Sequence, residues 1–351
     1  MANREAILHS FDPSGVGLDN GNLYGLPFDY ETANIIIIPV PWEVTVSYQG
    51  GTAKGPEAVL KASPQLDLYD LDKPEGWKQG IYMLPIPNWI QQRNAKLRPL
   101  ARKIIEATEQ GQNISANPSL SIALEAVNSG CIEVNQWLYQ NSRQALKQGK
   151  KVGAIGGDHS IPLGLMQALA EQHSEFGILH IDAHADLRDA YQGFQFSHAS
   201  IMNNAIKLPQ VAALVQVGVR DISHGEIATI SSSKGRIVTH YDSVLKQEQY
   251  QGISWQELCS RIIAPLPKKV YVSFDVDGLD PKLCPHTGTP VPGGLELEET
   301  FFLLRSLAKS DREIIGFDIS EIGDHEWDGN VGARIVYKIC NLMDLYRNSY
   351  A

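Results

Sequence analysis

The sequence predicts an α/β protein with a mostly parallel sheet that is covered by helices on both faces. Short β-branched apolar runs alternate along the chain with segments of helical periodicity, and this repeated order is typical of parallel sheets. Several of the runs are apolar at every position, as expected for strands buried on both faces. We expect one such domain over residues 34–351, preceded by an N-terminal arm over residues 1–33.

The elements follow in chain order. The predicted strands are residues 34–39, 151–156, 176–181, 212–219, 236–240, 269–274 and 313–319. The predicted helices are residues 55–62, 97–110, 122–148, 161–172, 255–263, 298–309 and 331–346. The last helix is amphipathic, which favours packing against the sheet. Residues 73–94, rich in Pro, Gly and Trp, and the polar residues 112–121 are predicted to be surface loops or insertions.

Composition narrows the class of protein. A chain of 351 residues with 43% hydrophobic residues can bury a large core. The net charge of −10 and the lack of a basic run argue against nucleic acid or an anionic membrane as partner. Four cysteines without a CxxC spacing suggest neither a zinc ribbon nor a disulfide framework. The N-terminus does not resemble a signal peptide and no apolar run approaches the ~20 residues of a membrane span, so a cytoplasmic protein is expected.

Ionisable residues recur where predicted strands end, and in open parallel sheets ligands bind at that edge. GGDHS follows the strand 151–156 and presents His159, although this segment alone is equally typical of a helix N-cap. After the strand 176–181 come Asp182, His184 and Asp186, and side chains two residues apart share one face of a strand. No lysine or arginine lies among these three residues, so the spacing favours a metal site over a salt bridge.

A third strand end adds Asp275 and Asp277, which again share a face. Four carboxylates gathered in low dielectric repel one another, and two divalent ions match their charge better than one. The oxygen-rich ligand set favours manganese, while nickel, cobalt, zinc and iron remain compatible with it. Two such ions lower the pKa of a bridging water, which predicts a two-metal hydrolase.

Four motifs, GGDHS, DAHAD, SFDVDGLDP and TGTPVPGGL, occur in this order and closely resemble those of the ureohydrolases, the family of arginase, agmatinase, guanidinobutyrase and formiminoglutamase. The similarity runs from about residue 35 to the C-terminus. The resemblance implies a three-layer α/β/α sandwich and a homo-oligomer, usually a trimer or hexamer. It also implies hydrolysis of a small cationic guanidino compound to urea and an amine by metal-bridging hydroxide.

The resemblance also implies roles for individual residues. The metal ligands would be His159 and Asp186 for the first ion, His184 and Asp277 for the second, and Asp182 and Asp275 as bridges. His198, in FSHAS, would be the proton shuttle, and an ordinary histidine pKa near 6.5 suits that task. Glu321, in GFDISEIGD, would hold the guanidinium by a charge-assisted hydrogen bond.

The chain departs from arginases where they hold the α-amino and α-carboxylate groups of arginine. Arg188, Phe194 and Phe196 replace the asparagine and serine side chains, and Ser223 stands at the position of an acidic residue. DLRDAYQGFQFSHASIM and LCPHTGTPVPGGL look more like agmatinase-type members. An agmatinase-like substrate is therefore favoured over arginine held in the arginase manner.

Arg188 bears on the substrate in two ways. It either pairs with Asp189 at the surface or meets a substrate carboxylate, and the second role would favour guanidinobutyrate or homoarginine over agmatine. Thr287 and Tyr48 are further pocket candidates, because each lies beside a motif. The alternatives are arginase or formiminoglutamase activity, a catalytically silent metal-binding paralogue, and a deacetylase-like hydrolase with one zinc. The complete ligand set argues against the last two.

Overall fold

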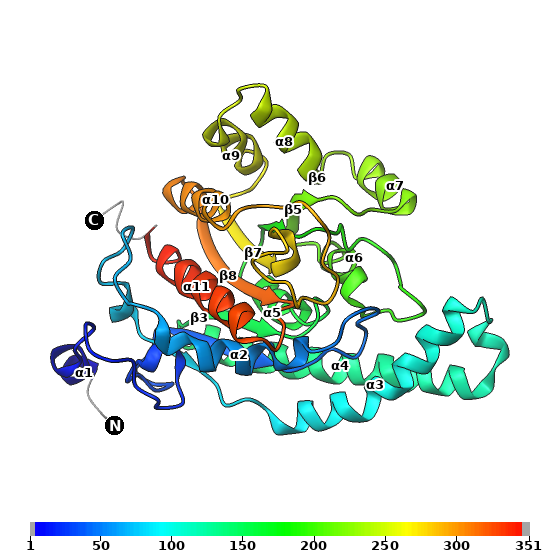
Figure 1. Ribbon diagram of the computed structural model, residues 1–351, viewed down its shortest axis with the longest axis horizontal. Coiled ribbons are helices and arrows are strands. Elements are labelled where there is room, and N and C mark those ends of the chain that lie inside the picture. Colours follow the sequence, from blue (N-terminus) through cyan, green and yellow to red (C-terminus); the bar gives the residue numbers. More distant parts are fainter. Residues whose placement is uncertain (1–3, 346–351) are drawn as a thin grey trace.

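The computed structural model describes residues 4–345. Its centre is an eight-stranded sheet with the order β2-β1-β3-β8-β7-β4-β5-β6, in which every neighbouring pair is parallel. Helices lie on both faces of this sheet (Figure 1). The predicted three-layer α/β/α sandwich is therefore confirmed.

The strands are β1 Ile35–Val40, β2 Ile81–Met83, β3 Lys151–Gly156, β4 Phe176–Ile181, β5 Val211–Val219, β6 Ile237–Tyr241, β7 Lys269–Asp275 and β8 Glu313–Ser320. The helices are α1 Arg4–Ser10, α2 Gly55–Ala62, α3 Asn88–Glu109, α4 Pro118–Lys147, α5 Leu163–Ala170, α6 Ile201–Ala205, α7 His224–Ser232, α8 Asp242–Tyr250, α9 Trp255–Ile263, α10 Leu297–Lys309 and α11 Glu326–Leu342.

The core lies between the sheet and its helical layers. Helices α2 and α11 pack on each other over β3 and β8, while α4 packs against β1, β3 and α5 (Figure 1). All six residues of β1 and of β4 are buried, which accounts for the continuous apolar sequence of β1 and for a single polar side chain, His180, in β4. Covering both faces in this way leaves the carboxyl edge of the sheet as the place where polar side chains gather.

Residues 73–94 are not only loop, as the sequence had suggested. They contain β2, which pairs with β1 at the sheet edge, and the first turns of α3. A three-residue strand is too short to show an alternation of apolar and polar residues. Pro85 and Pro87 come just before α3, which begins at Asn88. Helices α1, α6, α7 and α8 were also missed, and the helix predicted to reach residue 346 ends at Leu342, with residue 346 outside the described part.

The segment before β1 packs on the domain. Leu23 and Tyr24 are buried, and the Tyr24 hydroxyl donates a hydrogen bond to the carbonyl of Ala333 in α11 at 2.8 Å.

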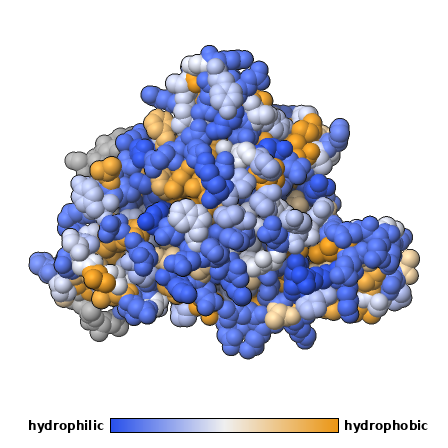
Figure 2. Space-filling model, viewed as in Figure 1, coloured by the Kyte–Doolittle hydropathy of each residue, from blue (hydrophilic) through white to orange (hydrophobic). Residues whose placement is uncertain are grey.

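All four cysteines are buried free thiols. Within residues 4–345, no helix combines the length and the apolarity that a membrane span requires. The face in Figure 2 is mostly hydrophilic, with small separate hydrophobic patches.

Candidate metal centre

The candidate site lies at the carboxyl edge of four adjacent strands. In the sheet order β3-β8-β7-β4, His159 follows β3, Glu321 follows β8, Asp275 ends β7 and Asp182 follows β4. These strands are far apart in the sequence, but the crossovers place their ends side by side. The structure therefore brings together all six predicted ligands, together with Glu321.

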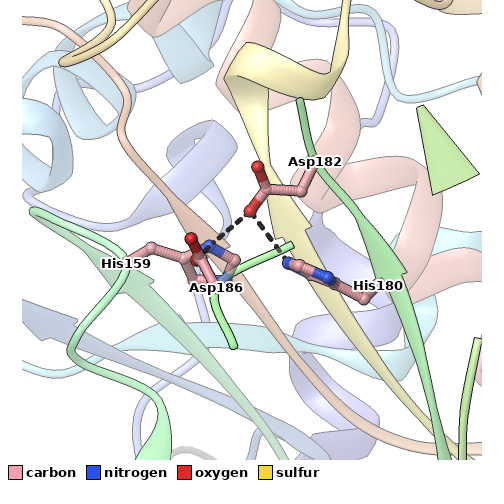
Figure 3. A group of neighbouring side chains, drawn as sticks. All are labelled: His159, His180, Asp182 and Asp186. Atoms are coloured by element: carbon pink, nitrogen blue, oxygen red, sulfur yellow. Dashed lines mark hydrogen bonds and ion pairs between the residues drawn. The ribbon is translucent and has the colours of Figure 1, made fainter. Parts of the chain in front are cut away.

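A first group of donor atoms surrounds the Nδ1 atom of His159. Two carboxylate oxygens lie beside it in Figure 3, Oδ2 of Asp182 at 2.9 Å and Oδ2 of Asp186 at 3.2 Å. Oδ2 of Asp275 is a third, at 3.2 Å. Ligands bound at about 2.1 Å and at right angles lie about 3 Å apart. Atoms of His159, Asp182 and Asp186 lie within 4.8 Å of one another, which fits a metal ion. Asp275 lies beside His159 and is a further predicted ligand.

A second group forms around His184. Its Nδ1 atom lies 3.1 Å from Oδ2 of Asp277 and 3.4 Å from Oδ1 of Asp182. Asp182 thus offers one oxygen to each group, which suits a bridging carboxylate. Asp275 contacts the first group through Oδ2, and its Oδ1 accepts the backbone N–H of Asp277 at 2.8 Å. Oδ1 of Asp182 likewise accepts the backbone N–H of His184, at 2.6 Å, so such a hydrogen bond does not exclude a bridging role. A bridge by Asp275 remains a prediction.

Burial makes this arrangement costly without cations. Burial and the charge of Asp182 raise the pKa of Asp186 to about 6. Burial and the neighbouring Asp277 and Asp182 carboxylates raise the pKa of Asp275 well above its usual value. Burial alone would lower the pKa of His159, but its hydrogen bonds to three carboxylates raise it well above 6.5. Divalent cations would replace these protons and stabilise the carboxylate charges.

His180 belongs to the centre and was missed from the sequence. Its Nε2 atom donates to Oδ2 of Asp182 at 2.8 Å (Figure 3). Its Nδ1 atom accepts from the side-chain amide of Gln216 at 3.0 Å. Both side chains are fully buried. The signal was present, since His180 and Asp182 are two residues apart and share a face. His180 orients Asp182, in the way that outer partners fix metal-ligating side chains.

Two of these residues adopt unusual backbone conformations. Asp186 has φ 54 and Glu321 has φ 64, a left-handed region that costs a non-glycine residue free energy. The backbone carbonyl of Asp186 accepts from Met202 and Asn203, and the N–H of Glu321 donates to Gly157 at 2.7 Å. Surrounding hydrogen bonds thus hold both side chains in place.

Glu321 presents a free acceptor. Its Oε1 atom accepts the backbone N–H of His159 at 3.0 Å, whereas Oε2 is buried without a hydrogen-bond partner. Burial and the charges of Asp158 and Asp277 raise the pKa of Glu321 well above its usual value. A buried carboxylate oxygen with no donor is unfavourable by itself. A cationic donor such as a guanidinium would satisfy it.

His198 is held close to this centre by a buried network. Its backbone N–H donates to Oγ1 of Thr45 at 3.2 Å, and the Thr45 hydroxyl donates to Oδ2 of Asp158 at 2.8 Å. Burial and the neighbouring His184 lower the pKa of His198 to about 3. The imidazole is therefore neutral at neutral pH, but it is a weaker base than the ordinary histidine on which the predicted shuttle role rests.

A cleft of about 250 Å³ opens above the centre, and His184, His198, Arg188 and Tyr48 line it. One of the two sequence-based interpretations of Arg188 was that it pairs with Asp189, and this is wrong. The guanidinium of Arg188 instead lies 4.9 Å from the centre of the Tyr191 ring, with Nε 4.0 Å from Oε2 of Glu226.

The other two pocket candidates are placed elsewhere. Ser223 caps α7, where its hydroxyl donates to Oε2 of Glu226 at 2.7 Å. Thr287 is fully buried, and its Oγ1 atom has no partner. Neither residue lines the cleft. Asp189 pairs with Lys207 at 3.4 Å instead of with Arg188.

Comparison with known proteins gives the site a context. A family model described as "Arginase family" matches residues 33–340. The chain is 31% identical to N(1)-aminopropylagmatine ureohydrolase of Thermus thermophilus over 84% of each chain. It is 29% identical to an agmatinase of Pyrococcus horikoshii over 84% of this chain and 85% of the relative. An agmatine ureohydrolase of Thermoplasma volcanium shares the fold with a TM-score of 0.69, at 19% identity, over 98% of this chain and 99% of its own.

Proposed function

Because this chain belongs to the arginase family and is a hydrolase of C–N bonds in linear amidines, we propose that it cleaves a small linear guanidino compound to urea and an amine. The observation that carries the proposal is the unpaired, buried Oε2 of Glu321, at the same sheet edge as two groups of metal ligands. Such an oxygen would accept hydrogen bonds from a planar cation with several N–H donors, such as a guanidinium.

The proposed centre holds two divalent ions, with manganese as the native metal and nickel or cobalt as alternatives. His159 and Asp186 would hold one ion, His184 and Asp277 the other, and Asp182 and Asp275 would bridge them. Asp182 would thereby be part of the catalytic machinery. When bound, such a pair supplies positive charge and a water of lowered pKa. We further propose a homo-oligomer, a trimer or hexamer, in the cytoplasm.

The residues of the chain have separate tasks in this proposal. Glu321 accepts N–H groups of the guanidinium and fixes its plane above the ligands. The neutral imidazole of His198 accepts a proton and returns it to the departing nitrogen, so that an amine leaves instead of an amide anion. Thr45 holds His198 in place through its backbone N–H.

Arg188 favours a substrate with a carboxylate on its tail. Arg188 lines the cleft, and the ion pair of its guanidinium with Glu226 is long, at 4.0 Å between Nε and Oε2. Much of the guanidinium charge is therefore available to a ligand. Guanidinobutyrate and homoarginine carry such a group. A cationic tail, as in agmatine, is the second candidate, because the exposed carboxylate of Asp221 lines the same cleft.

A panel assay tests the proposal. Protein loaded with manganese, nickel or cobalt is given agmatine, arginine, homoarginine, guanidinobutyrate, guanidinopropionate and guanidine, and urea is measured. Formiminoglutamate is included, with formamide as its product. We expect urea from at least one guanidino compound and its loss in Asp182→Asn. No urea from any member with any metal would overturn the proposal.

The variants Arg188→Gln and Asp221→Asn separate the two kinds of tail. If Arg188 meets a carboxylate, Arg188→Gln lowers kcat/KM for guanidinobutyrate roughly 10- to 100-fold, the effect of losing a charged hydrogen bond. Asp221→Asn would then leave that value nearly unchanged. The opposite pattern, with agmatine as the affected substrate, would favour the cationic tail.

A further inference from the structure

Helix α3 holds the backbone segment that follows β1 through two of its side chains. Nη1 of Arg98 donates to the carbonyl of Val44 at 3.1 Å and also to the carbonyl of Val46. One helical turn earlier, Oδ1 of Asn94 accepts the backbone N–H of Glu43 at 2.8 Å. Asn94 and Arg98 are four residues apart, so they share one face of α3. This face of the helix therefore fixes the backbone of the segment.

The peptide group between Val44 and Thr45 lies between a guanidinium and a carboxylate. Its carbonyl oxygen accepts from Arg98, and its N–H donates to Oδ2 of Asp158 at 3.1 Å. The hydroxyl of Thr45 donates to the same carboxylate oxygen at 2.8 Å. Hydrogen bonds to charged groups are stronger than neutral ones, and linked hydrogen bonds polarise one another. Arg98 therefore acts on Thr45 through this peptide group.

Thr45 connects the segment to the proposed proton carrier. Its Oγ1 atom accepts the backbone N–H of His198 at 3.2 Å and lies 3.4 Å from Nδ1 of the imidazole. Both residues are buried, and side chains in a close-packed interior shift only together with their neighbours. A displacement of the backbone at Thr45 would therefore move the imidazole of His198.

The charge of Arg98 also suits its surroundings. Arg98 is half-buried, and burial lowers the pKa of its guanidinium. The carboxylates of Glu43, Asp158 and Glu321 act on this pKa in the opposite direction. Because a guanidinium stays protonated at neutral pH, its positive charge offsets part of the negative charge that is buried beside the site.

We propose that Arg98 is a positioning residue for the reaction: by holding the carbonyls on both sides of Thr45, it places the imidazole of His198 for proton transfer. This inference rests on the proposed function, in which His198 returns a proton to the departing nitrogen. Arg98 is not among the residues that line the cleft described above. Its loss should therefore lower kcat and leave KM nearly unchanged.

Two variants of Arg98 and one control test this role in the full-length, metal-loaded protein. Arg98→Met keeps an unbranched side chain and removes the donors, whereas Arg98→Lys keeps a charged donor. Arg102→Met is the matched control, because Arg102 lies one turn further along α3 and is exposed. For the wild type and each variant, kcat and KM for urea release are measured in H2O and in D2O. Metal content, melting temperature and the hydrogen exchange of residues 43–47 are measured on the same samples.

We expect kcat of Arg98→Met to fall roughly 10- to 100-fold, the effect of a small displacement within the catalytic geometry. KM should stay within about threefold of wild type, because uniform substrate binding is not affected. The ratio of kcat in H2O to kcat in D2O should rise, since proton transfer then limits the rate. Arg98→Lys should recover part of kcat, and Arg102→Met should match the wild type. Hydrogen exchange of residues 43–47 should be faster in Arg98→Met.

Wild-type kcat in Arg98→Met, or a loss of kcat that only follows a loss of bound metal, would overturn the role of Arg98 and leave the proposed function intact. If Arg98→Met does not fold, Arg98→Lys replaces it: a partial loss of kcat at unchanged KM supports the role, and wild-type kcat with unchanged hydrogen exchange overturns it. Hydrogen exchange requires no substrate, so it separates the two proposals. Absence of urea with the wild type would overturn the proposed function, whereas faster exchange in Arg98→Met would still support the contact with the segment that carries Thr45.

Discussion

Replacing Gly288 by alanine tests whether Glu321 holds the substrate. The added methyl group would lie 2.4 Å from Oε2 of Glu321 and 3.3 Å from its carboxyl carbon, whereas ordinary contacts begin at 3.4 Å. The carboxylate or the loop must therefore move by about 1 Å. Gly288 is not among the glycines with positive φ, so alanine fits its backbone and the effect is steric. A displacement of about 1 Å in a substrate-positioning group lowers the rate roughly 100-fold.

The assay is kcat/KM for urea release on the best substrate of the panel, together with metal content and melting temperature. Gly225→Ala is the control, because Oγ of Ser223 at 4.0 Å is the nearest neighbour of the added methyl group. We expect Gly225→Ala to retain wild-type activity and Gly288→Ala to lose about two orders of magnitude with its metals still bound. Activity within a few-fold of wild type in Gly288→Ala would refute contact between Glu321 and the guanidinium.

Three further predictions concern the network, the metals and the core. Thr45→Val leaves the buried N–H of His198 unpaired, so we expect a loss of about 1–3 kcal/mol in unfolding free energy and lower kcat, whereas Thr45→Ser should retain both. Because the metal-free pKa of Asp186 is about 6 and metal binding requires the carboxylate, protons compete below pH 6. Apparent metal affinity, measured against a chelating dye, should therefore fall by roughly tenfold or more per pH unit from pH 6 to 5, and it should also fall from pH 8 to 7, because the pKa of His159 is raised well above 6.5 and its proton competes there as well. Ile37→Ala, fully buried in β1, should cost about 2–5 kcal/mol in urea denaturation, and Ile122→Ala, 68% exposed, less than about 0.5.

The sequence was sufficient to predict most of the sheet and the side chains that meet at its carboxyl edge. Strands such as β1 are long apolar runs, and predicted ligands such as Asp182 and His184 follow β4 at a spacing of two residues. Local pattern and general topology then place the site at one edge of the sheet. A strand of three residues such as β2 has no periodicity to detect, because its existence depends on pairing with β1.

Residues that act through tertiary contacts were beyond the reach of local pattern. Thr45 meets Asp158 across 113 positions of sequence, and neither spacing nor composition points to that pair. His180 lies two residues before Asp182 in the sequence, but this spacing is equally typical of a polar residue within a strand that has no part in a site. The position of Arg188 depends on the fold of the segment after β4, which stacks it on Tyr191 and leaves Asp189 to Lys207.

Two of the buried carboxyl groups lie at points where the backbone is strained. Asp186 and Glu321 both adopt left-handed conformations that are unfavourable for these residue types. Burial raises the pKa of both carboxyl groups. Without bound cations, both the backbone conformation and the loss of hydration are therefore unfavourable at these two residues. The surrounding hydrogen bonds, from Met202 and Asn203 to Asp186 and from Glu321 to Gly157, maintain the geometry. The rest of the fold therefore holds these two carboxyl groups in place, and the proposed binding of cations and a guanidinium would stabilise them.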